Sequence, residues 1–406
     1  MRAREPELDG PRRVTERENL LSAVESLRDV LETHAAQAES DRTLPRPVVD
    51  AMLNEGLLQF LSPREVGGGE ADPLTHLEVM EAVARIDTSA AWSLMIGAAT
   101  TTLLGAYLPD SVVGDVFGAG QWPISAGQLA PLGHAERVEG GYNVTGRWAF
   151  GSGISHSTWV VGGAFVEEAG ESMSGPDGAP IRVIVIAPKE RWTVHDTWQA
   201  AGLKGSGSSH YSLDREFIAN DFVIAYPTPE QHRGGAVYRE TRTTIIPVGH
   251  TGFALGVARR VLDEITKLAH SKMRGYGPNR AGIAGRSVFQ KELAEADTRV
   301  RAARLLAFDV FGRAWDAARA GDPGADERQA ETQLAATYVT DVAAEVAGWA
   351  YRFGGGDALY ESSPLQHYWR DINAATQHFF VADVNYERYG QIMLGMGPGA
   401  EGAAGR

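Results

Sequence analysis

Apolar residues recur at helical spacing through the first hundred residues of the chain. Val48 and Met52 are four positions apart, as are Leu53 and Leu57, and this period is typical of one face of an α-helix. The glycine- and proline-rich stretch at residues 62–73 interrupts the pattern, as a loop between helices does. We therefore predict an all-helical region over about residues 20–108.

The pattern changes to short β-type runs between Gln121 and about Pro227. Runs such as YNVTGRWAF, TWVVGGAFV and IRVIVIA are rich in branched and aromatic residues. Glycine-rich turns separate them, which is typical of strands. The stretch at residues 170–180 has the composition of an exposed hairpin loop. This part of the chain predicts a small β domain.

Helical spacing returns after about Arg239. The apolar seam of a long helix runs through Leu293, Ala296, Val300, Ala303, Ala307 and Val310. Pro278 and the glycines near it end one helix, and the next is predicted to begin near Ser287. We therefore divide the chain into a helical domain (1–120), a β domain (121–228) and a second helical domain (229–406).

Composition narrows the function classes. The chain has 406 residues, a formal net charge of −14 and no cysteine. The acidic balance argues against nucleic acid or an anionic membrane as partner, and without cysteine any redox chemistry needs a bound cofactor. The uncharged run at residues 89–108 is predicted to be a buried helix, or two short ones, because polar residues dilute it and its flanks are acidic. The charged N-terminus lacks the apolar core of a secretory signal, so we expect a cytoplasmic protein.

Four segments in chain order resemble acyl-CoA dehydrogenases. They are residues 44–92, which end in an Asp-to-Trp signature, and residues 141–153, 196–218 and 353–380. The resemblance implies an α+β, acyl-CoA dehydrogenase-like fold with an N-terminal α-helical domain, a middle β-barrel or sandwich domain and a C-terminal four-helix bundle. The third segment departs from the family pattern at Ser206 and His210, so no role is carried over to them.

The fourth segment distinguishes the branches of this family. After the pair Arg370-Asp371, many dehydrogenases carry a Tyr-Glu-Gly-Thr stretch whose glutamate is the catalytic base, whereas this chain reads Gln-His-Phe-Phe. His378 resembles the histidine of the oxygenase branch at this place, and Ser152 resembles the serine that ends its flavin-binding strand. Some dehydrogenases carry their base on another helix. An FAD-dependent acyl-CoA dehydrogenase or oxidase, and a non-catalytic flavin-scaffold protein, therefore stay open as alternatives.

The oxygenase branch includes two-component aromatic hydroxylases, dibenzothiophene monooxygenase, indole oxygenases and amino-sugar N-oxygenases. The resemblance implies a flavin-dependent monooxygenase, in which reduced flavin (FADH2 or FMNH2) and O2 form a C4a-hydroperoxide that a dry site protects. His378 is the candidate donor to the peroxide, because an imidazole that titrates near neutral pH can fill this role. Ser152 is the candidate that holds the proton near flavin N5. The alternative for an isolated histidine is a core position.

The same resemblance assigns the flavin contacts. Trp148 and Phe150 are predicted to form an apolar wall, and the backbone of Ser125, Gly127 and Gln128 is predicted to meet the polar edge of the flavin. For the phosphate or pyrophosphate we predict Arg274, together with Arg280 and Arg286, Gln290, and a backbone nest at Gly354, Gly355 and Gly356. The structural alternatives are a core aromatic, a solvated basic loop and a helix-ending glycine cluster.

No nicotinamide-binding fingerprint is present, because GLKGSGSS at residues 202–209 lies between β-type runs rather than before a helix. A separate NAD(P)H:flavin reductase is therefore expected to deliver the reduced flavin, and the family implies a homotetramer. The 11 histidines form no metal-binding motif, so we predict no metal. The choice between FAD and FMN stays open.

Phenol-hydroxylating relatives often carry a histidine in the helix after the Asp-to-Trp signature, whereas the run GAATTTLLGAYL has none. We therefore predict a substrate that is already activated, such as an indole, an electron-rich polycycle or an amine of the kind made in secondary metabolism. The predicted pocket residues are Trp92, Met95, Thr101 and Phe253. The alternative for this set is ordinary core packing.

Overall fold

The computed structural model describes residues 10–118, 120–239, 244–275, 281–322 and 326–396. Within these ranges the chain forms two compact units. The described residues of the first unit are 10–71, 89–118, 120–200 and 204–239, and those of the second are 72–88, 201–203, 244–275, 281–322 and 326–396. The chain therefore passes from one unit to the other several times.

The first unit contains the helices α1 (Gly10–Ser26), α2 (Arg28–Asp41), α3 (Arg46–Asn54) and α6 (Asp110–Phe117), and nearly all of α5 (Thr88–Tyr107). The uncharged run is one helix, α5, and most of its side chains are buried. Arg233 holds the C-terminal end of α5, because its guanidinium donates to the carbonyls of Gly105 (2.8 Å) and Leu108. None of the helices in the described part of the chain has the length and apolar character that a membrane crossing needs.

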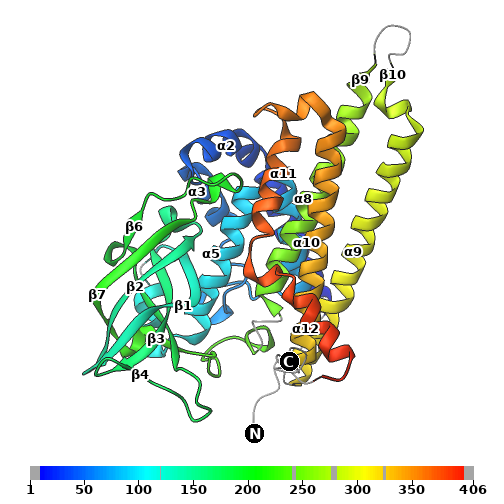
Figure 1. The fold of residues 1–406 in the computed structure, drawn as a ribbon. Coiled ribbons are helices and arrows are strands. Elements are labelled where there is room, and N and C mark those ends of the chain that lie inside the picture. The colour runs from blue at the N-terminus through cyan, green and yellow to red at the C-terminus, as the bar shows by residue number, and fades with distance from the viewer. Residues whose placement is uncertain (1–9, 119, 240–243, 276–280, 323–325, 397–406) are drawn as a thin grey trace, which may run out of the picture. The chain divides into compact units, whose positions relative to one another are not determined.

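Eight strands of the first unit form one mixed sheet (Figure 1). They are β1 (Ser125–Val138), β2 (Gly141–Gly151), β3 (Trp159–Glu168), β4 (Glu171–Ser172), β5 (Arg182–Pro188), β6 (Thr193–His195), β7 (Ser209–Ala219) and β8 (Val223–Tyr226). The hydrogen-bonded order is β6-β7-β2-β1-β3-β5-β8, with β4 paired to β3. Only β1 and β3 pair in parallel among these strands. The predicted hairpin loop lies between β3 and β5 and contains β4.

The sheet curls around one apolar core. β5 and β7 are four places apart in the hydrogen-bonded order, yet they contact each other, which requires strong twist and curvature. The Trp148 indole lies in this core, with its ring centroid 5.7 Å from that of Tyr211. Gly133, Gly146 and Gly162 surround the indole, and a Cβ added at any of them would lie between 2.4 and 2.9 Å from it. These glycines therefore make room for a core tryptophan.

Six helices and a short ribbon form the described part of the second unit. The helices are α4 (Pro73–Ile86), α8 (Ile246–Ser271), α9 (Ser287–Ala320), α10 (Asp326–Gly354), α11 (Pro364–Ala375) and α12 (Val384–Met393), and the ribbon is β9 (Met273–Arg274) with β10 (Ala281–Gly282). The long helices α8, α9 and α10 run side by side (Figure 1). α4 packs along α8, where a Cβ at Gly252 would lie 2.5 Å from the Leu77 carbonyl oxygen. Glycine therefore permits this close helix contact.

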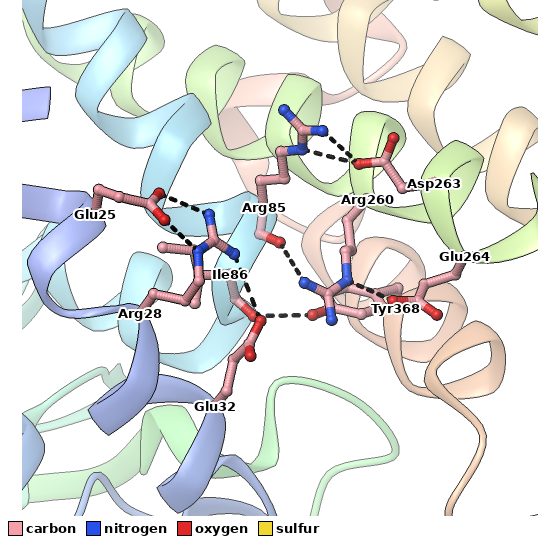
Figure 2. A network of polar contacts seen from close by, with 9 residues as sticks. All are labelled: Glu25, Arg28, Glu32, Arg85, Ile86, Arg260, Asp263, Glu264 and Tyr368. Carbon is pink, nitrogen blue, oxygen red and sulfur yellow. Dashed lines mark hydrogen bonds and ion pairs between the residues drawn. The ribbon is translucent and has the colours of Figure 1, made fainter. Parts of the chain in front are cut away.

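Polar contacts at the C-terminal end of α4 join it to α8 and α11 (Figure 2). Arg85 pairs with Asp263 of α8 at 2.7 Å. Arg260 of α8 donates to the Arg85 carbonyl (3.2 Å), and Tyr368 of α11 donates to the Ile86 carbonyl (2.9 Å). These donors satisfy carbonyls that a helix end leaves open. They therefore fix α11, the helix that precedes His378.

The predicted order of helices, strands and helices is confirmed, and so is the α+β class. α9 begins at Ser287 as predicted, and of the predicted seam only Leu293 is half-buried rather than buried. The predicted barrel or sandwich is a single curled sheet. Pro278 and Arg280 lie outside the described residues. The division into three domains stays a prediction.

Candidate functional site

Three serine hydroxyls of the first unit form a buried chain. The Ser208 hydroxyl lies 2.6 Å from that of Ser152, which follows β2, and 2.7 Å from that of Ser206. The indole N–H of Trp92 on α5 donates to the Ser152 hydroxyl at 3.1 Å. All three serines are buried. Ser152, the predicted catalytic serine, therefore belongs to a connected set of three serines. Sequence reasoning missed this set, because the contact between Ser152 and Ser208 joins residues that are far apart in the chain.

Trp148 and Phe150 lie close together on β2 and have opposite environments. Trp148 is fully buried, and its indole N–H donates to the Gly163 carbonyl at 2.8 Å. The prediction that Trp148 forms a wall of the flavin site is wrong, because the surrounding core leaves no face of its ring open to a ligand. Phe150 is 62% exposed and has a φ of 61°, a left-handed conformation that costs a non-glycine residue about 1–2 kcal/mol. An exposed ring on a strained backbone is typical of a functional site.

The stretch at residues 125–128 begins β1, and most of its polar main-chain groups bond within the first unit. The Ser125 N–H donates to the Thr101 hydroxyl (2.9 Å), and the Gln128 N–H donates to a tyrosine hydroxyl of β7 (2.8 Å). Gly127 has a φ of 123°, and a Cβ there would lie 2.1 Å from the Val161 carbonyl oxygen, so strand packing requires this glycine. The Ser125 and Gln128 N–H groups therefore have protein partners. Contact of flavin with the other main-chain groups of Ser125, Gly127 and Gln128 stays a prediction.

The Ser125 hydroxyl has a different environment from its main chain. It is buried, and it has no hydrogen-bond partner among the described residues. A buried hydroxyl without a partner carries a free-energy cost of about 1–3 kcal/mol. A bound polar group would remove this cost.

The predicted pocket residues are buried side chains. Trp92, Met95 and Thr101 lie on α5 and are all buried, and two of them hold Ser152 and Ser125 as described above. Phe253 lies on α8 of the second unit, where its ring centroid is 6.3 Å from that of His250. A direct contact of these residues with substrate stays a prediction.

His378 lies in a turn of the second unit, between α11 and the short 3-10 helix Phe379–Val381. The residue is half-buried and its Nδ1 atom is buried. Its ring centroid is 5.4 Å from that of His250, a buried histidine of α8. Burial and the nearby His250 lower the pKa of His378 to about 3. The expected titration near neutral pH is therefore wrong. His378 is a neutral imidazole at pH 7, which still donates one N–H.

Sequence reasoning missed His250. It lies in the apolar helical run GHTGFALGVA. The sequence pattern there does not distinguish a functional histidine from a histidine that is hydrogen-bonded in the core. Burial lowers the pKa of His250 to about 4. Only its position beside His378 in space identifies it as part of the candidate site.

Arg370 and Asp371, which precede His378 in the chain, contact segments before α11. Arg370 donates to the Ala201 carbonyl at 2.6 Å. The Asp371 carboxylate is fully buried and accepts the Leu203 N–H at 2.6 Å and the Thr88 hydroxyl. These contacts fix α11 to the segments at residues 88 and 201–203, and this role is structural.

The predicted phosphate-binding residues are partly brought together. Arg274 donates to the Phe353 carbonyl (2.8 Å), and a Cβ at Gly355 would lie 3.2 Å from its guanidinium, so Arg274 lies beside Gly354, Gly355 and Gly356. The Gln290 amide donates to the Ala284 carbonyl (2.9 Å) at the start of α9. Among the residues with described positions, no group of three or more His, Cys, Asp or Glu side chains is arranged to hold a metal ion.

Comparison with protein families gives two matches in this chain. Residues 15–107 match the acyl-CoA dehydrogenase N-terminal domain, and residues 248–383 match the acyl-CoA dehydrogenase C-terminal domain. Together they include α5, α8 and the turn that carries His378. The matched ranges flank the sheet, in the order that the resemblance implied.

Individual relatives extend the similarity along almost the whole chain. Indole-3-acetate monooxygenase from Pseudomonas putida is 29% identical over 384 residues, which cover 93% of this chain and 94% of the relative. The oxygenase subunit HsaA of a flavin-dependent monooxygenase from Rhodococcus jostii is 27% identical, with 88% and 93% covered. The solved structure of XiaF from a Streptomyces species, in complex with FADH2 and glycerol, has a TM-score of 0.82 at 24% identity over 96% of this chain and 98% of that one. This chain belongs to the flavin-dependent monooxygenases that are built on the acyl-CoA dehydrogenase fold.

Proposed function

We propose that this chain is the oxygenase component of a two-component system. A separate NAD(P)H:flavin reductase supplies reduced flavin, and the oxygenase uses it with O2 to hydroxylate or oxygenate an aromatic, indole or amine-type small molecule. The observation that carries the proposal is the neutral, partly exposed His378, which stands where a dehydrogenase of this fold carries a carboxylate base. The named relatives are monooxygenases, which supports this proposal over acyl-CoA dehydrogenation.

The residues of the first unit fit a flavin. Phe150 offers an exposed ring for an apolar face, and its strained backbone holds the ring outward. The Ser125 hydroxyl is a buried polar group that lacks a partner among the described residues. Ser152 is held by hydroxyl and indole donors and acceptors. We propose that these three side chains hold the flavin, and that main-chain groups of Gly127 and Gln128 other than the bonded Gln128 N–H meet its polar edge.

Bound reduced flavin supplies the two electrons that activate dioxygen. The part of the protein is to exclude water and to place hydrogen bonds where charge develops. We propose that the neutral His378 donates its N–H to the oxygen that develops charge, since a donor that the fold already holds in place needs little reorganisation to do so. Ser152 holds the proton at the flavin nitrogen. Trp92 and Met95 of the first unit and Phe253 of the second unit are the proposed substrate contacts, and Thr101 positions Ser125.

The remaining parts of the proposal concern the cofactor tail and the assembly. Arg274, Gln290 and the stretch Gly354–Gly356 supply cation, amide and main-chain groups for a phosphate or pyrophosphate, which leaves FMN and FAD both possible. We propose a homotetramer, as the family resemblance implies, and a cytoplasmic location. The binding of the cofactor tail and the oligomeric state do not affect the role proposed for His378.

Titration of the apoprotein with reduced FMN and reduced FAD, followed by rapid mixing with oxygen, tests the function. We expect a transient absorbance distinct from reduced and oxidised flavin. Indole, indole-3-acetate and an aromatic amine serve as substrate probes, and oxygenated product at the expense of hydrogen peroxide is the expected result. Immediate release of all oxygen as peroxide with every probe, together with anaerobic bleaching of bound FAD by an acyl-CoA, would support the dehydrogenase alternative.

A further inference from the structure

The turn that carries His378 is fixed by buried polar side chains on both sides. On one side, the Ala375 carbonyl at the end of α11 accepts the His378 main-chain N–H at 3.1 Å. The same carbonyl lies 3.2 Å from the Nε2 atom of His250. On the other side, the Asn385 amide donates to the Phe380 carbonyl at 2.8 Å. The turn is therefore held before and after His378.

Both contacts lead to the same face of α10. The Nδ1 atom of His250 lies 3.2 Å from the Thr340 hydroxyl, and the Asn385 amide donates to the Thr337 hydroxyl at 2.9 Å. Thr337 and Thr340 are buried and lie about one helical turn apart on α10. One helix therefore supports both anchors of the turn.

The direction of the hydrogen bond between His250 and Ala375 follows from chemistry. A carbonyl oxygen only accepts, so the Nε2 atom of His250 must carry the hydrogen. In a neutral imidazole the Nδ1 atom then has no hydrogen. The Thr340 hydroxyl donates to the Ala336 carbonyl at 2.8 Å and also lies 3.2 Å from this Nδ1 atom, so its one hydrogen is shared between the two acceptors. This arrangement defines one tautomer and one ring orientation for His250.

We propose that His250 is a positioning residue, whose Nε2–H bond to the Ala375 carbonyl and whose ring beside the His378 imidazole fix the turn and the orientation of His378. The inference deepens the proposed function and rests on it for the role of His378. His250 touches no reacting atom in this proposal. It acts through the main chain of the turn and through ring contact at 5.4 Å.

Hydrogen–deuterium exchange of the apoprotein, followed by mass spectrometry, tests the proposal without flavin. In His250→Phe, which keeps a planar ring but has no donor, we expect the peptide over residues 376–381 to exchange about fivefold faster, the effect of losing one buried hydrogen bond. His250→Gln keeps an N–H at similar reach and should restore slow exchange. The proposal would be overturned if this peptide exchanges at the wild-type rate in His250→Phe. It would also be overturned if the peptide exchanges equally fast in His250→Phe and His250→Gln.

A threonine pair on α10 provides a matched control. Thr340→Val removes the hydroxyl beside His250, whereas Thr332→Val removes a buried hydroxyl of the same helix that donates to the Gln329 carbonyl. We expect faster exchange at residues 376–381 in Thr340→Val alone. Equal effects of the two substitutions would show that helix packing, rather than His250, governs the turn. This pair also keeps the proposal testable if His250→Phe does not fold.

The same variants separate positioning from failure of the proposed function. With the flavin-loaded enzyme, His250→Phe should lower product per flavin oxidised about fivefold while reduced-flavin affinity stays within about twofold, because one hydrogen bond is lost away from the flavin contacts. His250→Gln should recover product formation. If wild-type protein forms no oxygenated product, the function proposal fails, whereas the exchange experiment still decides the role of His250.

Discussion

The first unit buries three serine hydroxyls that bond to one another, whereas the second unit buries an imidazole, His250, that bonds to a main-chain carbonyl. Each hydroxyl both donates and accepts, so a chain of hydroxyls reverses its direction when the O–H bonds rotate. A carbonyl only accepts, so the bond from His250 has one direction. The serine chain can therefore bond either to a donor or to an acceptor. The bond from His250 to the Ala375 carbonyl holds one geometry.

Substitutions in the two units should therefore differ in their effects. In the serine chain either Ser152 or Ser208 can be the donor. The turn around His378 is held by hydrogen bonds of fixed direction, such as the one from the His378 N–H to the Ala375 carbonyl. Loss of His378 should therefore not be compensated by its neighbours. Loss of a single serine should cost less.

The largest effect is expected for His378→Ala. Removal of a hydrogen-bond donor that acts in the reaction should lower product formation on the order of a thousandfold, within the range for proton-transfer groups. Peroxide release should rise in its place, as measured by product and peroxide yields per reduced flavin. His270→Ala changes an exposed histidine of α8 and should leave both yields unchanged. Equal losses in the two variants would remove His378 from the candidate site.

A smaller effect, on stability, is expected for Asp371→Asn. The buried carboxylate accepts the Leu203 N–H and the Thr88 hydroxyl, and an amide in its place turns a donor toward one of them. We expect the free energy of unfolding to fall by about 3 kcal/mol, the range for a broken buried charged contact. Denaturant unfolding monitored by tryptophan fluorescence measures it. Asp383→Asn, at an exposed position, is the control and should change little.

Some features of the fold and of the candidate site can be predicted from the sequence, and others cannot. The order of helices and strands and the start of α9 at Ser287 follow from apolar spacing and from glycine and proline, because these act locally. The environment of Trp148 does not, because three glycines on separate strands create it. The pairing of His250 with His378 joins residues far apart in sequence, and the partners of Asp371 do so too. Their chemistry depends on tertiary contacts that no spacing encodes.

Acid should destabilise the second unit through His250. Its pKa is lowered to about 4 by burial, whereas the unfolded chain titrates near the ordinary value of about 6.5. The unfolded state therefore binds the extra proton first, so the stability contribution is complete above about pH 6.5 and is lost as pH falls toward 4. Between these limits the free energy of unfolding should fall by about 1.4 kcal/mol per pH unit for this histidine.

The matched variant for acid sensitivity is His250→Gln, which has no titrating group. Its unfolding free energy, measured in denaturant at pH 7, 6 and 5, should show a shallower pH dependence than that of the wild type. His270→Gln removes an exposed histidine from the same helix and should leave the wild-type slope in place. A wild-type slope in His250→Gln would mean that other groups dominate acid unfolding, and that the buried imidazole is not held neutral by the fold.

The smallest effect is expected at Phe150 of the first unit, whose backbone is in a strained left-handed conformation. Asparagine tolerates the left-handed conformation better than phenylalanine, so Phe150→Asn should leave the free energy of unfolding unchanged or raise it by up to about 1 kcal/mol. Loss of the exposed ring should weaken reduced-flavin binding about fivefold, the size of one ring contact. Arg215→Asn relieves a similar strain (φ 51°) on β7 and carries no predicted flavin contact. Fluorescence titration should therefore separate the two variants, whereas denaturant unfolding should not. If both variants bind reduced flavin with wild-type affinity, the Phe150 ring does not contact the flavin. The left-handed conformation at Phe150 would then be a feature of the fold alone.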